Sequence, residues 1–139
     1  MRGVVNVDKK IKILIVDDEE LICWSLRRTL EQNEQFAVNC LYTAHDALKD
    51  IGEENYDIII TDLRLPDVNG AEFITKIKEL INDTPVIVIS AYLSHPVMND
   101  FSEYDVFRCI NKPFELNEIM CVVKDAIDYS VTGINAVKP

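Results

Sequence analysis

The stretch "IIITDLRLPDVNG", residues 58–70, begins with a run of isoleucines and places Asp62 where the apolar run ends. A second stretch, "IKILIV" at residues 11–16, is followed in the same way by Asp17 and Asp18. Both runs are apolar at successive positions instead of at every second one, which indicates strands that are covered on both faces. Such strands are typical of a parallel sheet with helices on either side.

Five short β-rich runs alternate with helical patterns along the chain, which predicts five βα units in a doubly wound α/β sandwich. Apolar residues at helical spacing fall within residues 44–51, 73–81 and 116–127. The weakest helix is expected in "SHPVMNDFSEYD", residues 94–105, because its apolar stripe is short. The expected strands are residues 11–16, 36–42, 56–60, 85–90 and 106–110.

The length and charge of the chain limit the functions it can have. A chain of 139 residues is expected to form one domain with a self-sufficient core. We place this domain at residues 10–129, between an N-terminal tail at 1–9 and a C-terminal tail or linker stub at 130–139. The net charge of −10 repels a phosphate backbone, so we expect no direct binding of nucleic acid by this domain.

Hydropathy and cysteine spacing indicate the compartment. No apolar stretch approaches the ~18 residues of a membrane-spanning helix, so we expect a soluble, cytoplasmic protein without a membrane partner. The four cysteines are far apart and lack the spacing of zinc ligands. We interpret all four as buried reduced thiols, and Trp24 as a packing residue. The cysteines are Cys23, Cys40, Cys109 and Cys121.

Polar residues follow the predicted strands at the point where each strand ends. Ligands of open parallel sheets bind beyond the carboxyl ends of the strands, so we expect these side chains to meet at one rim. Carboxylates ~4 Å apart repel each other by about 4 kcal/mol at an effective dielectric constant near 20, so the rim should bind a cation, and hard oxygen ligands favour Mg²⁺. The rim residues are Asp17 and Asp18 after the first strand, Asp62 after the third, Ser90 after the fourth and Lys112 after the fifth. Carboxylates, a hydroxyl and a lysine beside a metal together predict phosphoryl transfer.

At these residues the chain resembles the receiver domain of two-component response regulators. The matching elements, in this order, are "VDDEE" (16–20), "DIIITDLRLPDVNG" (57–70), "PVIVISAY" (85–92) and "NKPF" (111–114). The resemblance extends from about Lys10 to Tyr129 and implies a flavodoxin-like fold with strand order 2-1-3-4-5. It also implies a phosphorylation-controlled signalling switch, which is a regulatory domain that catalyses only its own phosphoryl transfer and slow dephosphorylation.

The resemblance further implies that Asp62 accepts a phosphoryl group from a sensor histidine kinase or a phosphotransfer protein, as an aspartyl phosphate. Asp17, Asp18, Asp62 and the backbone carbonyl of Arg64 would hold Mg²⁺, the implied cofactor. The phosphorylated state would be relayed to an output domain or a downstream protein. The implied surface for this relay, and for a homodimer, comprises the helix at 94–105, the strand at 106–110 and the helix at 116–127.

Ser90 and Lys112 stand where the family binds phosphoryl oxygens, and the bond from Lys112 to Pro113 where the family has a cis peptide. These assignments have structural alternatives. Acidic residues before a helix often only cap it, and Ser90 could be a strand-terminal hydroxyl. In the loop after Asp62, Asn69 followed by Glu72 has the pattern of a helix cap, so Asn69 and its neighbour Asp67 are left out of the site, and Gly70 is interpreted as a turn and packing residue.

One position departs from the family pattern. Three residues before Lys112, where receivers usually carry a Tyr or Phe that swings inward on activation, this chain has Cys109. Phe107, expected on the same alternating face of the strand, and Tyr92, two residues after Ser90, are the candidates for part of this switching and gating role.

Two other functions stay open at this point. A receiver-like docking module that is not phosphorylated is favoured only by the missing aromatic at Cys109. A Mg²⁺-dependent phosphohydrolase with Asp62 as a transient nucleophile would want a second acid as general acid, such as an Asp two residues after the nucleophile, and Arg64 occupies that place.

Overall fold

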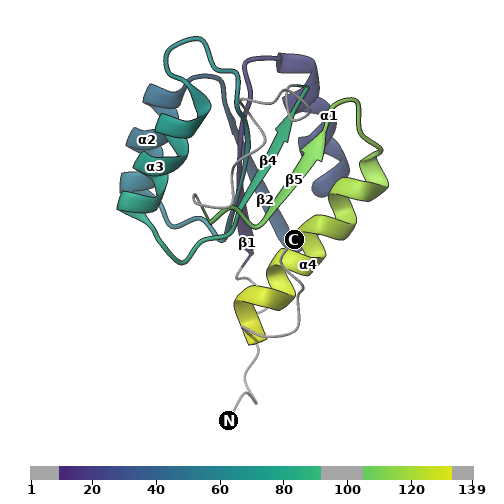
Figure 1. The fold of residues 1–139 in the computed structure, drawn as a ribbon. Helices are drawn as coiled ribbons and strands as arrows, with labels where there is room; N and C mark the ends of the chain where they lie inside the picture. Colours follow the sequence, from purple (N-terminus) through teal and green to yellow (C-terminus); the bar gives the residue numbers. More distant parts are fainter. Residues whose placement is uncertain (1–9, 92–104, 133–139) are drawn as a thin grey trace.

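The computed structural model describes residues 10–91 and 105–132, with side chains up to Ser130. Its five strands form one parallel sheet in the order β2-β1-β3-β4-β5, which confirms the predicted order. Helices α2 and α3 cover one face of the sheet, and α1 and α4 cover the other (Figure 1). The strands are β1 (Ile11–Val16), β2 (Phe36–Leu41), β3 (Ile58–Asp62), β4 (Val86–Ser90) and β5 (Arg108–Asn111). The helices are α1 (Glu20–Leu30), α2 (Ala44–Glu53), α3 (Gly70–Leu80) and α4 (Leu116–Thr132).

The expected elements are found with small shifts at their ends. Strand β3 begins and ends two residues later than expected, so that Asp62 is its last residue. The helix expected at 94–105 falls on residues that, apart from Asp105, lie outside the described part of the chain. Helix α4 is therefore the helix expected from Leu116, and it continues to Thr132, beyond the proposed domain limit at residue 129. The limits of the two tails stay predictions.

The core consists of two apolar layers, one on each face of the sheet. In β1, Ile13 and Ile15 pack into the layer beneath α1 and α4, whereas Leu14 and Val16 pack into the layer beneath α2 and α3. All four side chains are completely buried. The continuous apolar run of β1 thus reflects a strand that is covered on both faces, as the sequence predicts.

The predicted packing role of Trp24 and the predicted burial of three of the four cysteines are wrong. Helix α1 buries Cys23, Leu26 and Leu30. Trp24 follows Cys23 by one residue, which turns it about 100° away from this face, and 57% of its surface is exposed. The guanidinium carbon of Arg28 lies 5.3 Å from the centre of its ring.

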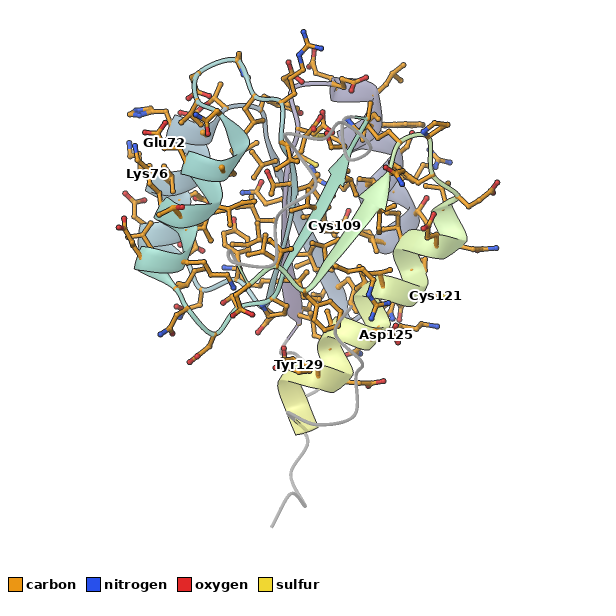
Figure 2. The ribbon with its side chains drawn as sticks, viewed as in Figure 1. Glu72, Lys76, Cys109, Cys121, Asp125 and Tyr129 are labelled. Atoms are coloured by element: carbon orange, nitrogen blue, oxygen red, sulfur yellow. The ribbon has the colours of Figure 1, made fainter. Side chains whose placement is uncertain are left out.

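Only Cys23 is a buried thiol. Cys40 is half-buried, and Cys109 on β5 and Cys121 on α4 are exposed (Figure 2). All four thiols are free. Within the described residues, none of the helices is long and apolar enough to cross a membrane.

Candidate functional site

Three carboxylates meet at the carboxyl ends of β1 and β3, as the sequence predicts. Asp17 directly follows β1, Asp18 comes next, and Asp62 ends β3. One carboxylate oxygen from each lies within 4.8 Å of the other two. Asp17 and Asp62 are buried while Asp18 is exposed, so the cluster is anchored in the sheet and open to solvent on one side. Three hard oxygen donors with room for water are a donor set that fits Mg²⁺.

Lys112 reaches this cluster from the loop after β5. Its Nζ lies 2.8 Å from a carboxylate oxygen of each of Asp17, Asp62 and Glu19. The peptide bond between Lys112 and Pro113 is cis, as the resemblance implies. Glu19 is not among the site residues predicted from the sequence. The only feature of the sequence that could have indicated its contact with Lys112 is its position within "VDDEE".

Burial and hydrogen bonds shift the pKa of Asp17 and of Lys112. Burial raises the pKa of Asp17 above its ordinary value, and the hydrogen bonds from Lys112 and from the Glu19 N–H oppose this shift only in part. Burial lowers the pKa of Lys112, but hydrogen bonds to Asp17, Asp62 and Glu19 raise it by more, so the net direction is upward. Lys112 therefore stays charged, and the charge of Asp17 is held at a cost that a bound cation would reduce.

Ser90 and Lys112 are brought together by the register of β4 and β5. Ser90 is the last residue of β4, is completely buried, and pairs with Asn111 of β5. The N–H of Lys112 donates to the carbonyl oxygen of Ser90 at 3.0 Å. On the other side of β4, Asp62 pairs with Ile89, the residue before Ser90. Three neighbouring strand ends therefore carry the acid, the hydroxyl and the lysine.

The loop after Asp62 is fixed at both ends. The N–H of Arg64 donates to Oδ1 of Asp62 at 3.1 Å, and Arg64 forms an isolated antiparallel bridge with Asn69. The side chain of Asn69 accepts the N–H of Glu72 at 2.8 Å and caps α3, which confirms its predicted capping role. This arrangement holds the backbone of Arg64 beside the carboxylate of Asp62.

Capping explains only part of the "VDDEE" segment. Oδ1 of Asp17 accepts the N–H of Glu19 at 2.9 Å, near the start of α1. Glu19 itself is the N-cap of this helix and makes no capping bond through its side chain. Asp18, which is exposed, instead contributes its carboxylate to the cluster with Asp62. The segment therefore supplies a turn at α1 and two members of the acidic rim.

The candidate switch residues do not share one face. Cys109 is exposed on β5 (Figure 2). Phe107 precedes β5 and is only 1% exposed, and its ring centre lies 5.5 Å from that of Tyr129 on α4. Phe107 thus packs in the layer of Ile110. The expectation that Phe107 shares the face of Cys109 is wrong, because strand alternation does not extend to a residue before the strand. Tyr92 lies outside the described residues.

Comparison with known proteins identifies the family. The family model "Response regulator receiver domain" matches residues 13–124. The chain belongs to the response regulator receiver domain family. A receiver domain (CheY-like) from Methanospirillum hungatei superimposes with a TM-score of 0.83 at 27% identity, covering 91% of this chain and 99% of that one. The solution structure of the beryllofluoride-activated NtrC4 receiver domain dimer gives a TM-score of 0.79 at 32% identity, covering 86% of this chain and 98% of that one.

A longer relative shows how such a domain is used elsewhere. The DNA-binding transcriptional regulator NtrC of Proteus hauseri is 28% identical over 121 residues, which is 87% of this chain. The chain spans 25% of the length of that regulator. Receiver domains are regulatory domains, and the family is consistent with signalling that depends on phosphorylation.

Proposed function

We propose that this receiver domain is a switch that is set by phosphorylation of Asp62. The observation that carries the proposal is the position of the Asp62 carboxylate, which lies at a strand end between an acidic cluster and the ammonium group of Lys112. A carboxylate oxygen of Asp62 attacks the phosphorus of a phosphohistidine in a sensor histidine kinase or phosphotransfer protein. The O–P bond forms as the N–P bond breaks, and the product is an aspartyl phosphate.

The neighbouring groups suit this chemistry. Lys112, already 2.8 Å from Asp62, is close enough to bind an oxygen of the transferred group, and the hydroxyl of Ser90 donates to another. Asp17, Asp18, Asp62 and the backbone carbonyl of Arg64 would hold Mg²⁺. When bound, Mg²⁺ supplies positive charge that neutralises the carboxylates and the developing phosphoryl charge.

The partners follow from the proposed role. The phosphorylated state acts on an output domain or a downstream protein, and the NtrC4 receiver domain dimer supports self-association as one way to transmit it. A docking module that is not phosphorylated has no use for three carboxylates held together beside one lysine. The acidic rim therefore favours the phosphorylated switch over this alternative.

Phosphorylation of the whole chain by acetyl phosphate and Mg²⁺ tests the proposal. Intact-mass measurement should show one added phosphoryl group that hydroxylamine removes, and Asp62→Asn should abolish it. Asp57→Asn is the matched control. Asp57 directly precedes the first residue of β3, at the other end of the strand from Asp62, and its carboxylate accepts the Lys12 backbone N–H at 2.8 Å. Labelling that persists in Asp62→Asn, or that is lost equally in both variants, would reject Asp62 as the acceptor.

A further inference from the structure

Two cysteines lie against each other in the layer beneath α1. Cys23 belongs to α1 and Cys40 to β2, and both pack in the same apolar cluster. Sγ of Cys40 lies 3.5 Å from the backbone oxygen of Cys23, and the two thiol groups also interact with each other. The fold thus brings together two sulfur atoms that the sequence separates and that the proposed phosphoryl chemistry does not use.

The two thiols differ in access and in acidity. Cys23 is 1% exposed, whereas Cys40 is half-buried on an edge strand of the sheet. The hydrogen bond with Cys23 lowers the pKa of Cys40, burial opposes this effect, and the nearby Arg27 guanidinium adds to the lowering. The half-buried sulfur is therefore the one that a reagent can reach and the one that more readily becomes a thiolate, which is the nucleophilic form.

We propose that Cys23 and Cys40 form an oxidisable thiol pair, a modification site whose reagent is a low-molecular-weight disulfide. The Cys40 thiolate attacks one sulfur of the reagent, and the reagent's S–S bond breaks and releases one thiol, which takes up the proton. Cys23 then loses its proton and attacks the Cys40 sulfur of the mixed disulfide, which releases the second thiol. Two protein thiols are oxidised to one disulfide, and one reagent disulfide is reduced to two thiols.

Oxidation would change a contact at the acidic rim. The thiol of Cys23 donates to the backbone carbonyl of Asp17 at 3.2 Å. A disulfide has no S–H, so this hydrogen bond is lost when the pair is oxidised, and α1 becomes tied covalently to β2. The modification site is thus joined by one hydrogen bond to the backbone of Asp17, a residue of the acidic rim.

The other two cysteines provide an internal comparison. Cys109 and Cys121 are more exposed, yet they lie on β5 and α4 and make no contact with another thiol among the described residues (Figure 2). Each should react with a disulfide reagent only as a single thiol and stop at the mixed disulfide. If exposure alone decided the reaction, Cys109 and Cys121 would be the thiols that react. Formation of a disulfide within the chain also requires two thiols close together, which is the case for Cys23 and Cys40.

To test the proposal, the full chain is treated with oxidised glutathione, and the remaining thiols are blocked by alkylation. The peptides are then identified by mass spectrometry. The expected product is a peptide pair that is linked through Cys23 and Cys40 and that dithiothreitol separates. The variant with Cys109→Ser and Cys121→Ser should form this link at the wild-type rate. Cys23→Ser should stop at a glutathione adduct on Cys40, and Cys40→Ser should leave Cys23 unmodified.

The peptide masses of the wild-type protein test the proposal even if a substitution at the buried Cys23 prevents folding. The proposal would be overturned if the wild type kept stable glutathione adducts on Cys40 and formed no link to Cys23. This result would have to be obtained at oxidant concentrations that modify Cys109 and Cys121 completely. A link that forms only after the protein has been unfolded in urea would also overturn the proposal. Because the readout is a disulfide and not a phosphoryl group, its failure is distinct from failure of Asp62 to accept phosphate.

Discussion

Gly70, the first residue of α3, lies directly against Leu63, the residue that follows Asp62. A Cβ atom at this position would lie 2.6 Å from Cδ2, 2.7 Å from the carbonyl oxygen and 2.8 Å from Cα of Leu63. Two of these atoms belong to the backbone that directly follows Asp62, so they cannot move without moving the loop. The absence of a side chain at Gly70 therefore allows α3 to begin directly against this backbone.

Replacing Gly70 by alanine should destabilise the domain by about 1–3 kcal/mol, as overpacking of a tight contact usually does. Phosphorylation by acetyl phosphate should also slow, since the backbone of Leu63 and Arg64 is displaced. Gly52→Ala is the matched control. Gly52 lies in α2, and a Cβ added to it would meet no atom within 4 Å apart from its chain neighbours and its own helix backbone, so alanine should stabilise the domain by roughly 0.5–1 kcal/mol. Urea unfolding of both variants checks the opposite signs, and equal effects would show that Leu63 yields to the Cβ at Gly70.

At the scale of elements, Asp67 joins the loop after β3 to the start of α2. Its two carboxylate oxygens accept the N–H groups of Ala44 at 3.0 Å and of His45 at 2.8 Å. Thr43 caps the same helix by accepting the N–H of Asp46 at 3.1 Å. Two segments more than 20 residues apart thus share one helix end, with negative charge at the positive end of its dipole.

Asp67→Asn should lower the free energy of unfolding by no more than the roughly 0.5–2 kcal/mol of a lost helix cap, because the side chain is exposed and screened. Partial burial raises the pKa of Asp67, but the N–H groups of Ala44 and His45 lower it by more, so the folded value lies below the ordinary 3.8. A lowered pKa gives stability that is present above pH 3.8 and is lost as the pH falls through the folded value. The difference between wild type and variant should therefore shrink in acid.

Urea unfolding between pH 2 and pH 7 measures this difference. Asp46→Asn is the control, because Asp46 lies in the same first turn of α2 and the substitution removes the same charge. Among the described residues, no backbone N–H donates to the Asp46 carboxylate, so this control loses no such hydrogen bond. A difference for Asp67→Asn that stays constant down to pH 2 would show that its carboxylate charge contributes nothing through these bonds.

The sequence predicts elements well where one physical signal dominates. Strand runs with apolar residues at successive positions locate the sheet, and the cap at Asn69 follows from its spacing to Glu72. Residue type alone misleads for Trp24, because the phase of α1 decides its exposure. Contacts between distant segments, such as those of Asp67 with α2 and of Glu19 with Lys112, depend on the closed fold and leave no local pattern.

At the scale of the whole molecule, the acidic rim exists because the ends of parallel strands meet at one edge. Among the described residues, Lys112 contacts Asp17, Glu19 and Asp62, and one ammonium group cannot balance these carboxylates together with Asp18. Burial raises the pKa of Asp17, which indicates that its negative charge is held at a cost. A ligand that lowers this cost in the folded state stabilises the entire domain.

Mg²⁺ at ten times its dissociation constant should therefore raise the free energy of unfolding by about 1.4 kcal/mol, or the melting temperature by roughly 3–6 °C. Asp17→Asn combined with Asp18→Asn should abolish this gain. Without Mg²⁺ the double variant should be as stable as the wild type or slightly more so, because like charges are removed while the amide oxygen introduced by Asp17→Asn can still accept the Glu19 N–H. Calorimetric melting with and without Mg²⁺ at constant ionic strength measures both quantities.

The control must separate binding at the rim from general screening of an acidic protein. Asp57→Asn combined with Asp83→Asn removes the same amount of charge. These two residues precede β3 and β4 and so lie near the amino-terminal ends of the strands, opposite the acidic rim. This control variant should keep the full gain, since screening depends on net charge whereas site binding depends on Asp17 and Asp18. An equal gain in all three proteins would mean that Mg²⁺ acts by screening, and the "VDDEE" acids would then keep only their part in the turn before α1.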